Sequence, residues 1–143
     1  MIVYAESSAV LSWLFGESRS KAVREVLDRA TVVVTSRITG IECARAIVRC
    51  EALGTITPAQ ANTLRELYDD AAAAWDVMEI DPRVAALAGE AFPVEPIRAL
   101  DAMHVATAAL AEERFRAVTM LSLDDRVRSN AAALGLTVVP KTA

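Results

Sequence analysis

The chain has 143 residues, 54% of them hydrophobic, and a formal net charge of −4 at pH 7. This length suits one domain of ordinary size, and the apolar content can fill a core without disulfides. We therefore expect residues 1–143 to form a single domain. The acidic balance excludes a protein that binds nucleic acid through a broad basic surface. Any contact with nucleic acid must be local or assisted by a metal ion.

Membrane-spanning and secreted proteins are also disfavoured. Charges break the longest apolar runs well before the roughly 18 residues that a membrane span needs, and no export signal is visible. Cys43 and Cys50 lie seven residues apart in one predicted helix. At ~1.5 Å per residue this separates them by about 10 Å, which is too far for a disulfide. We expect both to be buried thiols in a reducing cytoplasm.

The first half of the chain alternates strands with helices. Residues 2–5 are an apolar run typical of a buried strand. Residues 9–15 predict a short helix, and residues 18–30 predict a second one. The β-branched residues 31–35 predict the next strand, and apolar residues at helical spacing predict a helix over 39–53.

The alternation continues beyond residue 56. Residues 57–60, Thr-Pro-Ala-Gln, combine a capping box with proline at the first helical position and start a long helix. Residues 75–80 predict the third strand, and Asp-Pro then starts a helix over 81–91. Two prolines predict a loop over 92–99, and residues 101–113 have the most regular helical pattern in the chain.

The last elements are a strand over 117–123, a helix over 126–134 and a strand over 137–139. Short, nearly all-apolar strands that alternate with helices are typical of a parallel sheet buried on both faces. We therefore predict an α/β protein: a three-layer α/β/α domain with a central, mostly parallel sheet of five strands.

Acidic side chains should gather at one edge of this sheet, because ligands of such sheets bind beyond the carboxyl ends of the strands. Glu6 follows the first strand, Glu42 lies early in the helix after the second, and Asp124 and Asp125 follow the fourth. Asp101 starts the helix that leads into the fourth strand, and such a helix begins near the same edge. Of these acids, we expect Asp125 to face solvent.

Clustered carboxylates repel one another and raise each other's pKa unless a cation lies between them. A hard ion such as Mg²⁺ or Mn²⁺ suits such oxygen ligands, and it can activate a water and offset charge on a phosphate. No Cys–His or Ser–His–Asp set is evident, and a single histidine argues against zinc. The pattern indicates metal-dependent hydrolysis of a phosphodiester.

Each residue also has a structural interpretation. Asp101 and Asp124 could each cap a helix, Glu42 could interact with a helix dipole, and Glu6 could be a solvated loop residue. His104 lies on the same helical side as Asp101. We favour a packed, hydrogen-bonded histidine over one that positions a water or a phosphate.

Four stretches resemble the PIN-domain ribonucleases, most closely the VapC toxins of bacterial toxin–antitoxin pairs. The likeness spans essentially the whole chain, and the order of the stretches is more specific than any one of them. They are Met-Ile-Val-Tyr-Ala-Glu-Ser-Ser-Ala at 1–9, Thr-Gly-Ile-Glu at 39–42, Leu-Asp-Ala-Met-His-Val-Ala-Thr-Ala at 100–108, and Leu-Ser-Leu-Asp-Asp-Arg-Val at 121–127 followed by Ala-Ala-Ala-Leu-Gly-Leu at 131–136.

The resemblance implies a metal-dependent endoribonuclease that uses Mg²⁺, with Mn²⁺ as a substitute. It assigns the metal and catalytic site to Glu6, Glu42, Asp101 and Asp124, with the Ser8 hydroxyl beside the metal. It also implies an RNA substrate, a homodimer, a cytoplasmic location and a small antitoxin that blocks the site. The family normally opens with Asp where Glu6 stands, and a geometric change near 1 Å can cost about 100-fold in rate.

Two other functions compete with this interpretation. A phospho-accepting signalling domain would use Asp81, Ser122 and Lys141, but it needs an acidic pair after the first strand, where Glu6 stands alone. A binding module of the same fold that has lost catalysis is the second, and Glu6 is the reason to consider it. For the antitoxin, we expect helix-in-groove docking on the face formed by residues 9–30, which carries Trp13 and Phe15, although we expect core packing for at least one of these two.

Overall fold

The central strand β1 (Ile2–Ala5) lies between β2 (Val32–Ser36) and β4 (Val118–Leu121) in a sheet in which every pairing is parallel. The computed structural model describes residues 1–141. The edges are β3 (Asp76–Met78) and β5 (Thr137–Val139), so the strand order is β3-β2-β1-β4-β5. This order differs from the 2-1-3-4-5 order of receiver-type signalling domains, which argues against that alternative.

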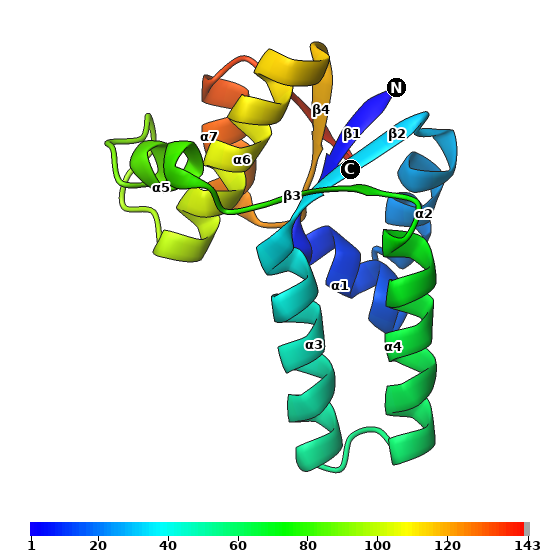
Figure 1. Cartoon of the computed structure of the whole chain (residues 1–143). Coiled ribbons are helices and arrows are strands. Elements are labelled where there is room, and N and C mark those ends of the chain that lie inside the picture. The colour runs from blue at the N-terminus through cyan, green and yellow to red at the C-terminus, as the bar shows by residue number, and fades with distance from the viewer. Residues whose placement is uncertain (142–143) are drawn as a thin grey trace.

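Helices cover both faces of the sheet, as Figure 1 shows. The predicted three-layer α/β/α arrangement with a five-stranded parallel sheet is confirmed. The helices are α1 (Ser7–Phe15), α2 (Ser20–Arg29), α3 (Arg37–Ala52), α4 (Pro58–Ala72), α5 (Pro82–Ala88), α6 (Ala99–Phe115) and α7 (Asp125–Ala133). Helices α3 and α4 lie side by side and extend beyond the sheet (Figure 1).

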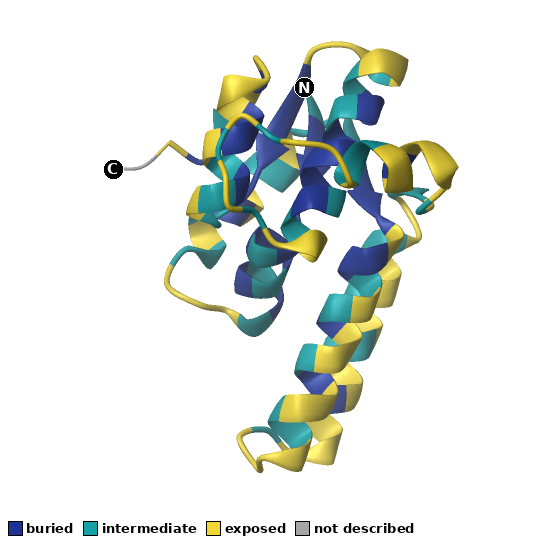
Figure 2. Cartoon of the chain, turned by 90° about the vertical axis from the view of Figure 1, so that its left-hand side faces the viewer, coloured by how far each residue is buried: buried dark blue, intermediate teal, exposed yellow. Residues whose placement is uncertain are grey.

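The core lies on the two faces of the sheet because successive side chains of a strand point in opposite directions. Val3 and Ala5 pack in one cluster with residues of α1 to α4. Tyr4 lies in a second cluster with residues of α6 and α7. Buried residues concentrate in the sheet and on the helix faces that pack against it, while the far ends of α3 and α4 are exposed (Figure 2).

Several helices start at residues other than those predicted, because of the side chains that cap them. Helix α1 begins two residues early because the Glu6 carboxylate accepts from the Ser8 amide, and α3 does so because the Ser36 hydroxyl accepts from the Ile38 amide. Helix α6 begins after Arg98, so the alternative interpretation of Asp101 as its N-cap is wrong. The capping box that starts α4 is present as predicted.

The outer elements are shorter than the sequence predicted. Strand β3 covers only residues 76–78, and α5 ends at Ala88 before Gly89.

Both cysteines are free, but only Cys43 is buried, and Cys50 is partly exposed. Among residues 1–141, no helix is long and apolar enough to cross a membrane.

Candidate active site

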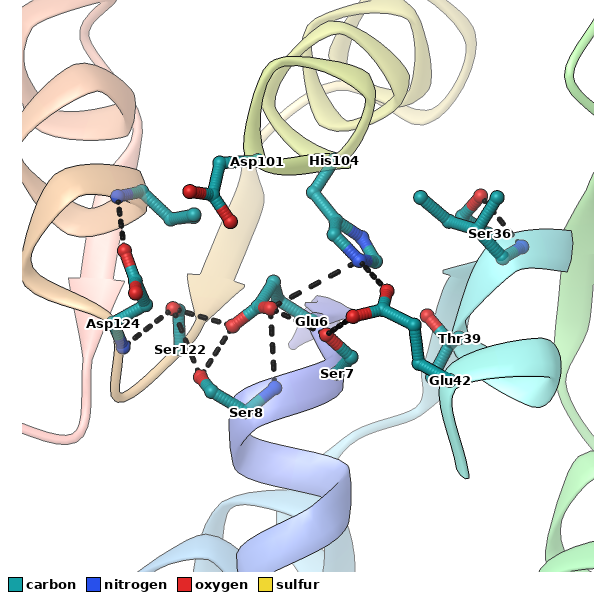
Figure 3. Close-up of polar contacts among 12 residues, drawn as sticks. Glu6, Ser7, Ser8, Ser36, Thr39, Glu42, Asp101, His104, Ser122 and Asp124 are labelled. Atoms are coloured by element: carbon teal, nitrogen blue, oxygen red, sulfur yellow. Dashed lines mark hydrogen bonds and ion pairs between the residues drawn. The ribbon is translucent and has the colours of Figure 1, made fainter. Parts of the chain in front are cut away.

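The predicted acids come from four segments that meet at the carboxyl edge of the sheet. Glu6 follows β1, Glu42 lies in the second turn of α3, Asp124 follows β4 and Asp101 lies in the first turn of α6. Figure 3 shows the Glu6 carboxylate between Asp124 on one side and Glu42 on the other, with Asp101 above it. Sequence order alone therefore placed these acids at the correct edge.

Glu6 is buried, with an exposed fraction of 2%, so its interpretation as a solvated loop residue is wrong. One carboxylate oxygen, Oε1, accepts from the Ser7 hydroxyl at 2.7 Å and from the Ser8 amide at 3.1 Å. The other, Oε2, accepts from the Ser122 hydroxyl at 2.7 Å and from the Ser8 hydroxyl. Hydrogen bonds offset the cost of removing this charge from water.

Glu42 is fixed by a buried histidine. Its Oε1 lies 2.7 Å from His104 Nε2, and its Oε2 lies 3.0 Å from the Ser7 hydroxyl oxygen, whose single proton is given to the nearer Glu6 carboxylate. The other nitrogen of His104, Nδ1, lies 2.9 Å from the Tyr4 hydroxyl. Both ring nitrogens are thus engaged within the protein. This confirms the packed, hydrogen-bonded histidine and leaves no ring nitrogen free for a water or a phosphate.

The direction of these hydrogen bonds follows from the donors available. Burial, and secondarily the Glu6 charge, raise the pKa of the Tyr4 hydroxyl well above its usual value, so this group stays protonated. A neutral imidazole has one donor and one acceptor nitrogen. We therefore assign the Tyr4 hydroxyl as the donor to Nδ1 of His104, and Nε2–H as the donor to Glu42.

Asp101 and Asp124 line a shared pocket of about 550 Å³ together with Arg98 and Arg126. Asp101 Oδ2 accepts from Arg98 Nε at 3.2 Å. Asp124 Oδ1 accepts from the amides of Arg126 and Val127, both at 2.9 Å, and so caps α7. The capping role that the sequence allowed for Asp124 is present, and its Oδ2 has no hydrogen-bond donor among residues 1–141.

Like charges act on Asp101. Burial raises the pKa of its carboxyl above the usual value, the Asp124 carboxylate raises it further, and Glu6 adds a smaller effect. The Arg98 guanidinium opposes these contributions. Repulsion between Asp101 and Asp124 is the condition that a bound cation relieves.

The donors suit a hard divalent ion, since all four predicted ligands are carboxylates. Asp101 and Asp124 share a pocket and repel each other, so they fit such an ion best. Within residues 1–141, however, no group of three or more Asp, Glu, His or Cys side chains lies close enough together to hold a metal ion. Glu42 is turned toward His104, away from this pair.

Several polar residues of the site were not predicted. Ser7 and Ser122 bind Glu6, Tyr4 contacts His104, and Arg98 contacts Asp101. A usable signal exists for Ser122 alone, because it follows β4 at the same edge where the predicted Ser8 follows β1. Asp125 is exposed, as expected.

Comparison with known proteins shows one family. The PIN domain matches residues 3–133. Ribonuclease VapC35 of Mycobacterium tuberculosis is 33% identical over 140 residues, which cover 96% of both chains.

Solved structures agree with the fold. VapC20 of Mycobacterium tuberculosis, described as a toxin that cleaves the sarcin–ricin loop, matches with a TM-score of 0.69 and 14% identity over 97% of this chain and 99% of its own. A toxin–antitoxin complex from Klebsiella pneumoniae matches with a TM-score of 0.63 and 15% identity over 96% of each chain. The chain belongs to the PIN-domain family and, within it, groups with the VapC-type ribonucleases.

Proposed function

We propose that this chain is a Mg²⁺- or Mn²⁺-dependent endoribonuclease and the toxin of a type II toxin–antitoxin pair. Family membership and a relative named as a ribonuclease support the activity. The observation that carries the proposal is the pair Asp101 and Asp124, which line one pocket at the carboxyl edge of the sheet. We propose that residues 1–143 act as one nuclease domain in the cytoplasm.

Asp101 and Asp124 would hold the ion, and Glu6 and Glu42 would add negative charge beside it. When bound, the ion supplies an activated water and offsets charge that develops on the scissile phosphate. The chain itself orients the substrate: Arg98 and Arg126 line the same pocket and can contact RNA phosphates. This is the local, metal-assisted contact that an acidic chain requires.

The antitoxin is proposed to cover an apolar groove on α3. This groove, of about 840 Å³, is lined by Ile41, Val48, Leu53 and Leu100, whose exposed fractions are 56%, 42%, 67% and 47%. Exposed apolar side chains that cluster in this way mark interaction sites. Glu42 also lines the groove, so a segment bound there would lie beside the candidate site.

This location replaces docking at residues 9–30, because Trp13 packs against Trp75 with ring centroids 6.2 Å apart. Arg45 and Arg49 also line the α3 groove and favour an acidic partner segment. The homodimer remains a separate expectation, which sedimentation of the purified chain would test.

A cleavage assay tests the proposed activity. Single-stranded RNA should be cut in the presence of Mn²⁺ or Mg²⁺ and should remain intact in EDTA, and the Asp101→Asn variant should be inactive. The alternative is a PIN-fold module that binds RNA or protein without catalysis. The internal hydrogen bonds of Glu6 favour this alternative. RNA binding without cleavage, by protein that binds Mn²⁺, would support it instead.

A further inference from the structure

The Glu6 carboxylate has no free acceptor position. Four donors reach it, two on each oxygen, from Ser7, Ser8 and Ser122. An ionised carboxylate offers about four lone-pair sites. Ser7 also lies near Glu42, but its contact with Glu6 is the shorter, at 2.7 Å against 3.0 Å. A metal ion could bind Glu6 only by displacing one of these donors.

The same hydroxyls fix the loop that carries Asp124. Ser8 Oγ donates to Glu6 and accepts from the Leu123 amide at 2.9 Å. Ser122 Oγ donates to Glu6 and accepts from the Asp124 amide at 3.1 Å. Each serine therefore connects Glu6 to a backbone amide of the loop between β4 and α7. Figure 3 shows the connection through Ser122 to Asp124.

The length of the side chain suits this role. Compared with the Asp that the family resemblance implies at this position, Glu extends the carboxylate by about 1.5 Å, one carbon–carbon bond. Its two oxygens contact both the start of α1, through Ser8, and the end of β4, through Ser122. These residues are 114 positions apart in the sequence, and Glu6 joins them at the edge of the sheet.

We propose that Glu6 is a positioning residue in this chain rather than a metal ligand: through Ser8 and Ser122 it holds the loop that presents Asp124. The inference rests on the proposed function insofar as Asp124 is a ligand. Asp101 and Asp124 are then the pair of acids that faces the pocket.

Removal of the relaying hydroxyls separates positioning from ligation. If Glu6 positions Asp124, Ser8→Ala and Ser122→Ala should each weaken Mn²⁺ binding by about 10- to 100-fold, as for other outer-sphere partners of metal ligands. If Glu6 is itself a ligand, each variant frees a lone pair on it, and Mn²⁺ binding should be unchanged or tighter. Calorimetric titration with Mn²⁺ measures the sign of the change.

A second measurement needs no metal. In EDTA, hydrogen exchange at the Leu123 and Asp124 amides should accelerate by roughly three- to tenfold in both serine variants and in Glu6→Gln. Each serine variant removes a hydroxyl that accepts from one of these amides, and Glu6→Gln removes the carboxylate to which both hydroxyls donate. Ser8→Thr keeps the hydroxyl and should restore both readouts. Ser12→Ala is the matched control, because the buried Ser12 hydroxyl has no hydrogen-bond partner among residues 1–141.

The outcomes distinguish the two claims. If the wild-type chain binds no Mn²⁺, the proposed metal site is wrong. The exchange rates would still test whether Glu6, through Ser8 and Ser122, fixes the loop that carries Asp124. Unaltered exchange in Ser8→Ala, Ser122→Ala and Glu6→Gln would show that Glu6 does not fix this loop and would overturn the proposal. Mn²⁺ affinity that is unchanged or tighter in Ser8→Ala and Ser122→Ala would contradict a positioning role of Glu6 and would also overturn the proposal.

Discussion

Replacement of Asp101 by Asn should change stability in opposite directions with and without metal. In EDTA the variant should melt at a higher temperature than the wild type at pH 7, because burial and the Asp124 and Glu6 charges all disfavour the ionised carboxyl of Asp101. With Mn²⁺ the order should reverse. The wild type should gain about 2.7 kcal/mol at a hundredfold excess of Mn²⁺ over its dissociation constant, and the variant should lose most of this gain.

The pH dependence follows from the same shift. The folded protein raises the pKa of Asp101 above its ordinary value of 3.8, so the folded state binds more protons than the unfolded one. Its stability therefore falls as pH rises from that value to the raised pKa. In EDTA, the free energy of unfolding of Asp101→Asn should come to exceed that of the wild type over this pH interval. The difference should remain constant at higher pH.

Calorimetric melting with EDTA and with Mn²⁺ at constant ionic strength measures both effects. For a chain of this size the metal should raise the melting temperature by roughly 10 °C, at about 4 °C per kcal/mol. Asp125→Asn is the matched control, because Asp125 lines the same pocket but is exposed. Identical melting of wild type and Asp101→Asn in both conditions would refute the assignment of Asp101.

Three further changes test neighbouring parts of the site. Arg98→Gln removes a cation that pairs with Asp101, so calorimetry should show tighter Mn²⁺ binding, while fluorescence anisotropy shows weaker RNA binding. His104→Leu leaves Glu42 Oε1 without its donor and should cost about 1–3 kcal/mol in urea unfolding, and a loss near zero would contradict the buried network. Ile41→Asp should leave stability within about 0.5 kcal/mol but weaken antitoxin capture, and unchanged capture would remove the α3 groove from the proposal.

The sequence predicted the kind and order of the elements because their periodicities are local. It also placed Glu6, Glu42, Asp101 and Asp124 at one edge, since that follows from the chain direction of parallel strands. The helix starts at Ser7 and Arg37 were missed because the sequence analysis assigned no capping role to Glu6 or Ser36, whose side chains set them.

The hydrogen-bond partners could not be predicted in the same way. Ser122 lies 116 residues from Glu6, and His104 lies 62 residues from Glu42. Their contacts depend on strand order and on side-chain rotamers, which local patterns do not specify. The sequence showed which residues reach the edge of the sheet, but not which of them bind one another there.

Under the proposed function, these contacts would let an acidic chain act on RNA. Glu6 and Glu42 are directed inward, toward serine hydroxyls and His104, and both are mostly or fully removed from solvent. The pocket presents Asp101 and Asp124, and Arg98 and Arg126 line it beside them. The net charge of −4 therefore does not describe the surface that RNA would meet. With a divalent cation between the two aspartates, the formal charges lining this pocket would favour a phosphate, and the acidic remainder of the protein would limit binding elsewhere.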